Sequence, residues 1–443
     1  MNFNVKGYIK EGIIPMKNKK FFAIALAGVM SLSLVACGGS DSEGNGGSEG
    51  NNNSSASSSE GIRLLNGKPE IDDYLLKLAD KYKQETGKTV SVETIGGDVN
   101  AADTLKNYYQ AENMPDVFVL EANQVSAWDG LLADMSGEEW TTKTDYALVD
   151  EKMGVIGCPY TVEATGLAYN EFLLAKAGIK PETLTSPEAY KKAFETLESR
   201  KEDLGIDAVV GYCAEAANLQ WSSGTHIFAQ YLDAGLDQND KTYIDLLNDG
   251  GKYDDARLKN FATFIDLMTQ YADKNLTVDG TYDKQVGKFA NGKYVFVTQG
   301  SWIDLSEADF NVGFAPYAFE DGIDTIIAGA PSYWAVYNGG KVDEAKEFLN
   351  WCYTESAERI LVEEAGLISP DKNCKFRAAN KFSESIKSYM DAGKTSGWHT
   401  MLKKEGLQNQ TGQVFADFAR GSLTIDEFCS TIKQVTESFY AAD

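Results

Sequence analysis

Short apolar runs alternate with helical patterns after Gly61, and this alternation limits the folds that the chain can adopt. Strands are predicted at 62–65, 90–95 and 117–120, and helices at 71–85 and 101–111. The order β-α-β-α-β is typical of a mostly parallel sheet covered by helices. Such sheets bind ligands beyond the carboxyl ends of their strands, so the loops after Ile95 and Leu120 are candidate contacts.

Later segments are richer in helix, and their ends carry recognisable caps. Ser186 and Pro187 form an N-cap with proline at the first helical position, ahead of a helix at 189–200. A strand is predicted at 209–212 and a long amphipathic helix at 256–271. Thr424 and Glu427 have the spacing of a capping box, which predicts a last helix that runs to about Tyr440.

Residues 1–36 have the pattern of a secretory signal peptide. Three lysines at 17, 19 and 20 precede an uncharged apolar run from Phe21 to Leu34. A membrane-spanning helix needs roughly 20 apolar residues, more than this run supplies. Met16 opens a more typical signal than Met1 does, so we expect the true start at Met16.

The segment that follows the signal predicts a lipid anchor on a flexible linker. The sequence Leu-Val-Ala-Cys-Gly that ends at Gly38 resembles the lipobox of bacterial lipoproteins, which implies acylation of Cys37. Two or more acyl chains hold a protein stably on a bilayer. Residues 38–60 are mainly Ser, Gly and Asn, and they contain nothing that could bury an apolar face. We therefore expect residues 37–60 to be a tether on the outer face of the cell membrane.

The net charge argues against a nucleic-acid partner, and the cysteine pattern argues against a metal site. The chain has 41 basic and 66 acidic residues, and its formal net charge of −25 disfavours nucleic acid and favours neutral or cationic ligands. Five cysteines follow Cys37, at 158, 213, 352, 374 and 429, and none forms a C-x-x-C pair. With only His226 and His399 besides, we expect buried thiols, no metal site and no cofactor.

Four stretches resemble, in order and spacing, the extracytoplasmic solute-binding proteins of ABC importers, and among them the oligosaccharide and maltodextrin binders. They are 114–118 with 130–134, 159–170, 289–293 with 298–302, and 345–353 with 366–370. The resemblance implies a two-lobed α/β fold of the periplasmic-binding-protein type (type II), with a ligand cleft between the lobes. It also implies a hinge of three crossings, near 162–167, 302–314 and 368–372.

The predicted lobes combine separate segments. The N-terminal lobe is expected at 61–164 plus about 295–312, and the C-terminal lobe at 165–294 plus about 313–443.

The resemblance also implies ligand contacts. Glu121 and Glu163 stand where maltodextrin binders accept hydrogen bonds from sugar hydroxyls, Trp302 where an aromatic ring stacks under a sugar ring, and Trp221 at a further contact. A sugar has polar edges and apolar C–H faces, which carboxylates and aromatic rings match. Further candidates are Asp98 in the loop after Ile95, Tyr160 near the first crossing, and the pair Tyr333 and Trp334. Core packing is the alternative for each tryptophan.

We therefore expect the binding component of an ABC importer, which captures an oligosaccharide by hinge closure and delivers it to permease subunits. A maltodextrin-like α-glucan is favoured, and the protein is expected to be a monomer without enzymatic activity. Two alternatives remain open: a binder of a non-sugar ligand such as a polyamine, and a surface glycan-binding sensor without transport. A glycosidase would need two carboxylates at a defined separation, of which the sequence gives no sign.

Overall fold

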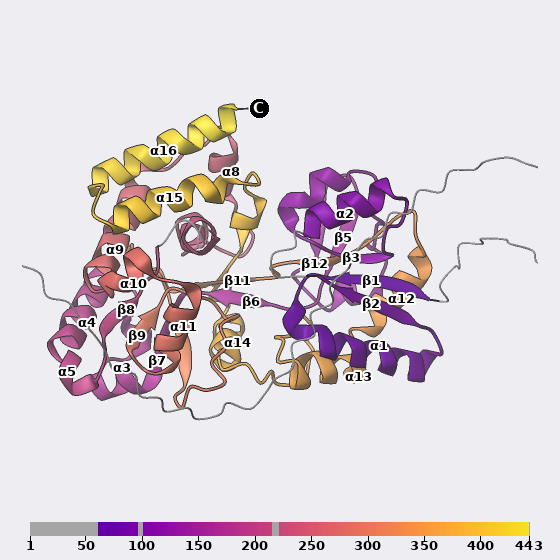
Figure 1. Ribbon diagram of the computed structural model, residues 1–443, viewed down its shortest axis with the longest axis horizontal. Coiled ribbons are helices and arrows are strands. Elements are labelled where there is room, and N and C mark those ends of the chain that lie inside the picture. The colour runs from indigo at the N-terminus through magenta and orange to yellow at the C-terminus, as the bar shows by residue number, and fades with distance from the viewer. Residues whose placement is uncertain (1–60, 96–100, 215–220, 443) are drawn as a thin grey trace, which may run out of the picture. The chain divides into compact units, whose positions relative to one another are not determined.

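The computed structural model describes residues 61–95, 101–214 and 221–442. The order of the strands divides this part of the chain into two lobes with a smaller sheet between them (Figure 1). The first lobe contains a six-stranded sheet in the order β2 (Val90–Thr94), β1 (Ile62–Asn66), β3 (Val117–Leu120), β12 (Tyr333–Val336), β5 (Gly154–Pro159) and β4 (Leu148–Asp150). Strands β2, β1 and β3 run parallel, as the β-α-β-α-β pattern predicts.

Helices cover both faces of the first sheet because successive strand residues point to opposite sides. Leu64 of β1 packs with Leu75 of α1 (Asp72–Thr86), whereas Leu65 packs with Leu105 of α2 (Ala101–Gln110). The buried positions of α1 recur at helical spacing, and Gly87 ends the helix in the left-handed conformation at φ 77°. Helices α12 (Val342–Trp351) and α13 (Glu355–Glu358) complete this lobe.

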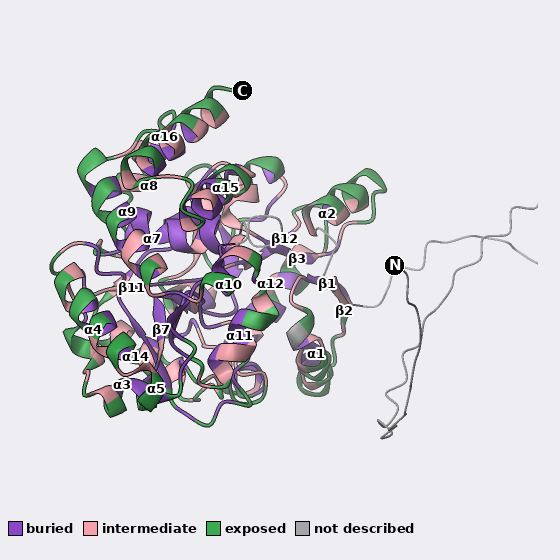
Figure 2. Cartoon of the chain, turned by 60° about the vertical axis from the view of Figure 1, so that its left-hand side comes forward, coloured by how far each residue is buried: buried purple, intermediate pink, exposed green. Residues whose placement is uncertain are grey.

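The second lobe is built around a four-stranded sheet and most of the helices. Its strands are β10 (Val312–Ala315), β7 (Leu167–Asn170), β9 (Tyr294–Val297) and β8 (Ala208–Gly211). Its helices are α3 (Glu171–Ala177), α4 (Pro187–Ser199), α5 (Lys201–Leu204), α7 (Phe228–Asp233), α8 (Thr242–Asn248), α9 (Asp255–Gln270), α10 (Lys274–Asp279), α11 (Tyr282–Ala290), α14 (Ser383–Asp391), α15 (Leu407–Ala419) and α16 (Ile425–Ala441). In Figure 2, α7 and the strands are purple, whereas the outer helices carry green, exposed faces.

Both predicted caps are present in this lobe. The Ser186 hydroxyl accepts a hydrogen bond from the Ala189 N–H at 3.2 Å. Thr424 and Glu427 bond each other's backbone N–H groups, at 3.3 and 2.8 Å, so the capping box of α16 is confirmed. These helix starts were predictable because a cap depends on residues only three apart.

The third sheet carries the connections between the lobes. It consists of β13 (Thr395–Ser396), β11 (Ile326–Gly329) and β6 (Glu163–Thr165). The chain crosses first through β6, returns from β11 into β12 of the first sheet, and leaves again near Ile368, which pairs with Val162. The first and third crossings were predicted at these places.

The second crossing and the lobe boundaries differ from the prediction. Strand β9 pairs with β7 and β8, and β10 pairs with β7, so residues 295–312 belong to the second lobe. The return lies at 330–332, and it is β12 that joins the first sheet, between β3 and β5. The reason for the error is that the 298–302 loop bonds to the crossing strand β6 without crossing itself: the N–H of Ser301 donates to the Ala164 carbonyl at 2.9 Å.

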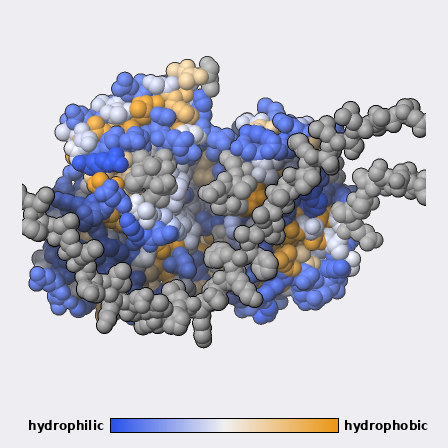
Figure 3. Space-filling model, viewed as in Figure 1, coloured by the Kyte–Doolittle hydropathy of each residue, from blue (hydrophilic) through white to orange (hydrophobic). Residues whose placement is uncertain are grey.

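The surface fits the acidic composition. Figure 3 shows a mainly hydrophilic face on which apolar side chains are scattered. Of the five cysteines in the described residues, Cys158, Cys213 and Cys352 are buried, Cys374 and Cys429 are half-buried, and all five are free thiols. The expectation of unpaired, mostly buried thiols is confirmed.

Candidate functional site

Trp302 lies in a tight loop after β9 that backbone contacts hold in place. A Cβ atom at Gly300 would lie 2.0 Å from Cζ3 of Trp302, so the ring folds back over a position where only glycine leaves room. The Ser301 hydroxyl accepts a hydrogen bond from the Ala164 N–H at 3.0 Å. Trp302 is therefore anchored to β6, next to the hinge.

Trp302 belongs to an aromatic cluster in the second lobe, formed by Trp221, His226, Trp302 and Trp398. The His226 and Trp302 rings lie 4.5 Å apart, and Trp398 stacks on Trp302 at 6.2 Å with an interplanar angle of 26°. Trp221 meets Trp302 edge to face at 6.4 Å. Trp398 is buried, whereas the other three rings keep part of their surface accessible. Trp398 thus backs the cluster, and we call the partly accessible rings of Trp221, His226 and Trp302 its accessible layer.

The imidazole of His226 is neutral in this setting. Burial lowers the pKa of His226 to about 3, and the charge of Lys403 adds to the shift. The ring therefore contributes an aromatic surface, and no positive charge, at neutral pH. A wall of this kind suits the apolar C–H face of a sugar ring.

Glu163 and Lys68 lie beside Trp302. The Glu163 carboxylate and the Lys68 ammonium are 2.6 Å apart, and their side chains are 15% and 18% exposed. Together with Trp302 they line a cavity of about 490 Å³, to which Thr161, Ile368 and Asn380 also contribute. This size lies within the usual range for small-molecule sites. The structure thus brings two of the predicted contacts, Glu163 and Trp302, into one cavity.

Glu121 stands at the carboxyl end of β3, where sheets of this kind bind ligands. Its side chain forms a capping box with Gln124 at the start of the short 3₁₀ helix Ala122–Trp128. Burial raises the pKa of Glu121, while the positive charge of Lys403 opposes the rise. Lys403 belongs to the second lobe, so these two charges interact between the lobes.

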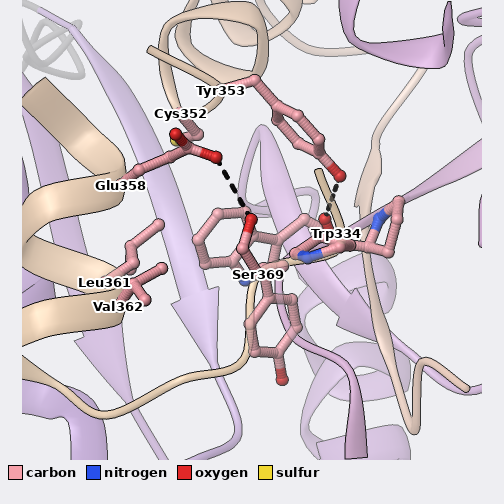
Figure 4. A pocket seen from close by; sticks show the side chains of 10 residues that line it. Trp334, Cys352, Tyr353, Glu358, Leu361, Val362 and Ser369 are labelled. Atoms are coloured by element: carbon pink, nitrogen blue, oxygen red, sulfur yellow. Dashed lines mark hydrogen bonds between the residues drawn. The ribbon is translucent and has the colours of Figure 1, made fainter. Parts of the chain in front are cut away.

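Tyr160 and Trp334, both predicted as ligand contacts, lie in the core of the first lobe. Their rings stack at 4.6 Å with an interplanar angle of 13°, and Trp334 is 1% exposed. The Tyr160 hydroxyl bonds the Ser332 hydroxyl at 2.7 Å. Figure 4 shows Trp334 among Cys352, Tyr353, Leu361 and Ser369, around a cavity of only about 10 Å³. Core packing, the alternative given for the tryptophans, therefore describes Trp334, and Tyr160 lies in the same core, with no room for a sugar beside the two rings.

Tyr333 points to the other side of the same strand. It pairs with Leu120 at the edge of the sheet where Glu121 stands, and its side chain lies over Gly157. Burial raises the pKa of Tyr333 to about 12, so the phenol is neutral at physiological pH. Its place beside Glu121 keeps it a candidate contact.

A family model described as bacterial extracellular solute-binding protein matches residues 77–422, most of the chain. The chain belongs to this family. A search of curated protein sequences finds no match. The family that the four sequence stretches indicated is therefore confirmed.

Solved structures share the fold of this solute-binding protein. The binding protein MsmE from Bacillus subtilis, in an open conformation, is 19% identical, with 84% of this chain and 95% of that chain covered and a TM-score of 0.68. A sugar transporter protein from Bacillus licheniformis in complex with stachyose is 18% identical, with coverages of 84% and 98% and a TM-score of 0.63. RafE of Streptococcus pneumoniae in its apo form is 17% identical, with coverages of 86% and 97% and a TM-score of 0.66. The predicted two-lobed α/β fold is confirmed.

Two predicted site residues of the solute-binding protein, Asp98 and Cys37, lie outside the described residues. Three residues near the site were not predicted: His226, Trp398 and Lys403. His226 follows Trp221 by five residues, and the π-helix Ser222–Ile227 brings the two rings to 5.6 Å, an arrangement that the i,i+3 and i,i+4 spacing of an α-helix does not predict. Trp398 and Lys403 come from a distant segment, which no local pattern connects to Trp302.

Within the described part of the chain, no group of three or more metal-binding side chains is close enough to hold an ion. The same part contains no helix that is long and apolar enough to cross a membrane.

Lys403 predicts a measurable pH dependence of stability. Its side chain is buried, its ammonium donates to Thr225 Oγ1 and to the Thr400 carbonyl, both at 3.2 Å, and burial lowers its pKa to about 8 against the opposing charge of Glu121. An unfolded lysine titrates near pH 10.4, so between pH 8 and 10 the unfolded chain binds more protons than the folded one. Stability should therefore gain up to about 1.4 kcal/mol per pH unit in this window from Lys403 alone.

Replacement of Lys403 by methionine should remove this contribution, which urea unfolding at pH 7, 8, 9 and 10 measures. The exposed Lys152 offers the matched control, Lys152→Met, which should keep the wild-type slope. Equal slopes for the wild-type and Lys403→Met proteins would contradict the prediction.

Proposed function

We propose that this solute-binding protein is the extracytoplasmic binding component of an ABC importer and that it captures an oligosaccharide. The observation that carries the proposal is the accessible ring of Trp302 beside Glu163 and Lys68 in a cavity of about 490 Å³. Stacking supplies affinity for the sugar face, and the charged pair supplies donors and acceptors for hydroxyl groups. The stachyose complex of the similar protein from Bacillus licheniformis supports an oligosaccharide as the ligand class.

Among sugars, a maltodextrin-like α-glucan remains our specific proposal, and it rests on the motif resemblance in the sequence. A panel of maltotriose, raffinose, stachyose and chitotriose, with spermidine as the non-sugar ligand, separates the candidates by thermal shift. A ligand at 100 times its Kd adds about 2.7 kcal/mol of stability, enough to raise the Tm measurably. Stabilisation by maltotriose alone supports the α-glucan. Stabilisation by spermidine alone would instead favour the polyamine alternative.

We further propose that ligand draws the two lobes together about the three crossings. Contacts to the sugar from both lobes are complete only in the closed state, so ligand shifts the population toward closure. Small-angle scattering should then give a smaller radius of gyration at saturating sugar than without it. The same samples, analysed by chromatography after several hours, should contain the sugar intact. Shorter products would contradict the assignment as a binding protein.

We propose that acylated Cys37 anchors the protein to the outer face of the cell membrane, where it meets its permease subunits. Cys37→Ser removes the thiol that a lipid would modify, so the variant should lose acyl labelling and leave the membrane fraction. Metabolic labelling with a fatty acid followed by fractionation measures both effects. Cys374→Ser is the matched control, since Cys374 is a half-buried thiol of the folded body and should not change either readout. Unchanged labelling of Cys37→Ser would rule out the anchor.

A further inference from the structure

A chain of hydrogen bonds runs from the indole of Trp302 into the interior of the second lobe. The indole N–H donates to Gln299 Oε1 at 3.0 Å, and Gln299 Nε2 donates to Gln285 Oε1 at 2.8 Å. Gln285 Nε2 in turn donates to the carbonyl of Gly211 at 2.7 Å and to Thr298 Oγ1 at 3.0 Å. The chain of amides thus joins the loop after β9 to α11 and to the end of β8.

The chemistry of its two ends fixes the direction of this chain. An indole N–H can only donate, and a backbone carbonyl can only accept. Gln299 must therefore present its oxygen to Trp302 and its NH₂ group to Gln285, and Gln285 must repeat the same orientation toward Gly211. Neither amide can turn over without placing like groups against each other.

Both glutamines are buried, and Gln299 also contacts the residue that follows Trp221. Gln285 is 0% and Gln299 1% exposed, so neither reaches a ligand in the cavity. Gln299 Nε2 also lies 3.3 Å from the hydroxyl of Ser222, the residue that follows Trp221. Placing two amides in a protein interior is costly unless they are bonded, and here the bonds link the Trp302 indole, through both amides, to the backbone of β8.

We propose that Gln299 and Gln285 are positioning residues that set ligand affinity by holding the plane of the Trp302 indole. This inference rests on the proposed function of Trp302 as the ring on which a sugar stacks. A ring held in one orientation before binding loses less freedom when the sugar arrives. The amides act on affinity only through Trp302.

A double-mutant cycle tests this dependence. Gln285→Glu keeps the acceptor for Gln299 but replaces the donor to Gly211 by a second oxygen, which should release the chain. The Kd of the panel sugar that binds best, measured by calorimetry among maltotriose, raffinose and stachyose, should rise about 3- to 10-fold. Trp302→Phe keeps a ring but has no N–H, so in that background Gln285→Glu should cause little further loss. An equal loss in both backgrounds would overturn the proposal in favour of a general structural role.

A second measurement needs no ligand, so it tests the positioning of Trp302 even if the proposed function is wrong. In nitrogen-15 spectra, the indole N–H signal of Trp302 is assigned by its absence in Trp302→Phe, and its hydrogen exchange should be slow in the wild type. Gln285→Glu and Gln299→Met should both shift this signal and speed its exchange at least several-fold. The control Gln270→Glu, at an exposed amide bonded only to Asp266, should change neither. If the Trp302 signal does not shift in either variant, the positioning role of the two glutamines is overturned, even where a sugar binds. If no sugar of the panel binds, the proposed function alone is refuted.

Discussion

Replacement of Trp334 by alanine should lower the free energy of unfolding by about 3–5 kcal/mol, the usual loss for a buried tryptophan. Trp334 is 1% exposed, stacks on Tyr160 and lies 6.4 Å from the ring of Phe348. Alanine would remove the ring and leave a cavity that packed strands on both sides cannot fill. Urea unfolding measures the loss directly.

The matched variant Trp334→Phe should lose much less, because phenylalanine keeps a ring over Tyr160. Sugar affinity per folded molecule should not change in either variant, since Trp334 faces the core. If Trp334→Ala kept its stability and lost its affinity, the ring would be a ligand contact after all.

Replacement of Trp302 by alanine should affect sugar affinity more than the free energy of unfolding, the opposite of Trp334→Ala. It should weaken oligosaccharide binding by about 1–3 kcal/mol, or about 5- to 150-fold in Kd, through loss of the stacking surface. The effect on unfolding should be smaller than that of Trp334→Ala, because Trp302 is only half-buried. Calorimetry with the best sugar of the panel, together with urea unfolding, separates the two quantities.

Trp221→Ala provides the comparison within the same cluster. Trp221 meets Trp302 edge to face and is also half-buried, so its loss should weaken binding by a similar or smaller amount. Undiminished affinity in both single variants would show that the stacking surface lies elsewhere in the cleft.

Local features of the fold were predictable because short-range physics decides them. Ser186 caps α4 and Thr424 caps α16 at the predicted places, since each cap depends on residues within one helical turn. The alternation of strands and helices likewise predicted the parallel strands β1, β2 and β3. The motif resemblance led to the correct family and fold.

The sequence did not predict which strands pair when they lie far apart in the chain. Strand β12 lies between β3 and β5, although both precede it by more than 170 residues in the chain. The residues of Tyr333–Val336 carry no pattern that predicts these two strands as partners. For the same reason β9 and β12 were assigned to the wrong lobe. A short apolar strand fits a sheet in either lobe, and only the packed chain decides between them.

The sequence by itself determined the family, the class of fold, the helix ends, and Glu163 and Trp302 as neighbours of the hinge. Tertiary structure alone decided which aromatic residues face the cavity. Tyr333 and Trp334 are adjacent in one strand, so the pleat turns them to opposite faces of the sheet, and only Trp334 joins the core cluster. Trp398 and the amides of Gln285 and Gln299 support Trp302 from separate segments. Side chains of one type differ in role here because the role depends on what covers each face.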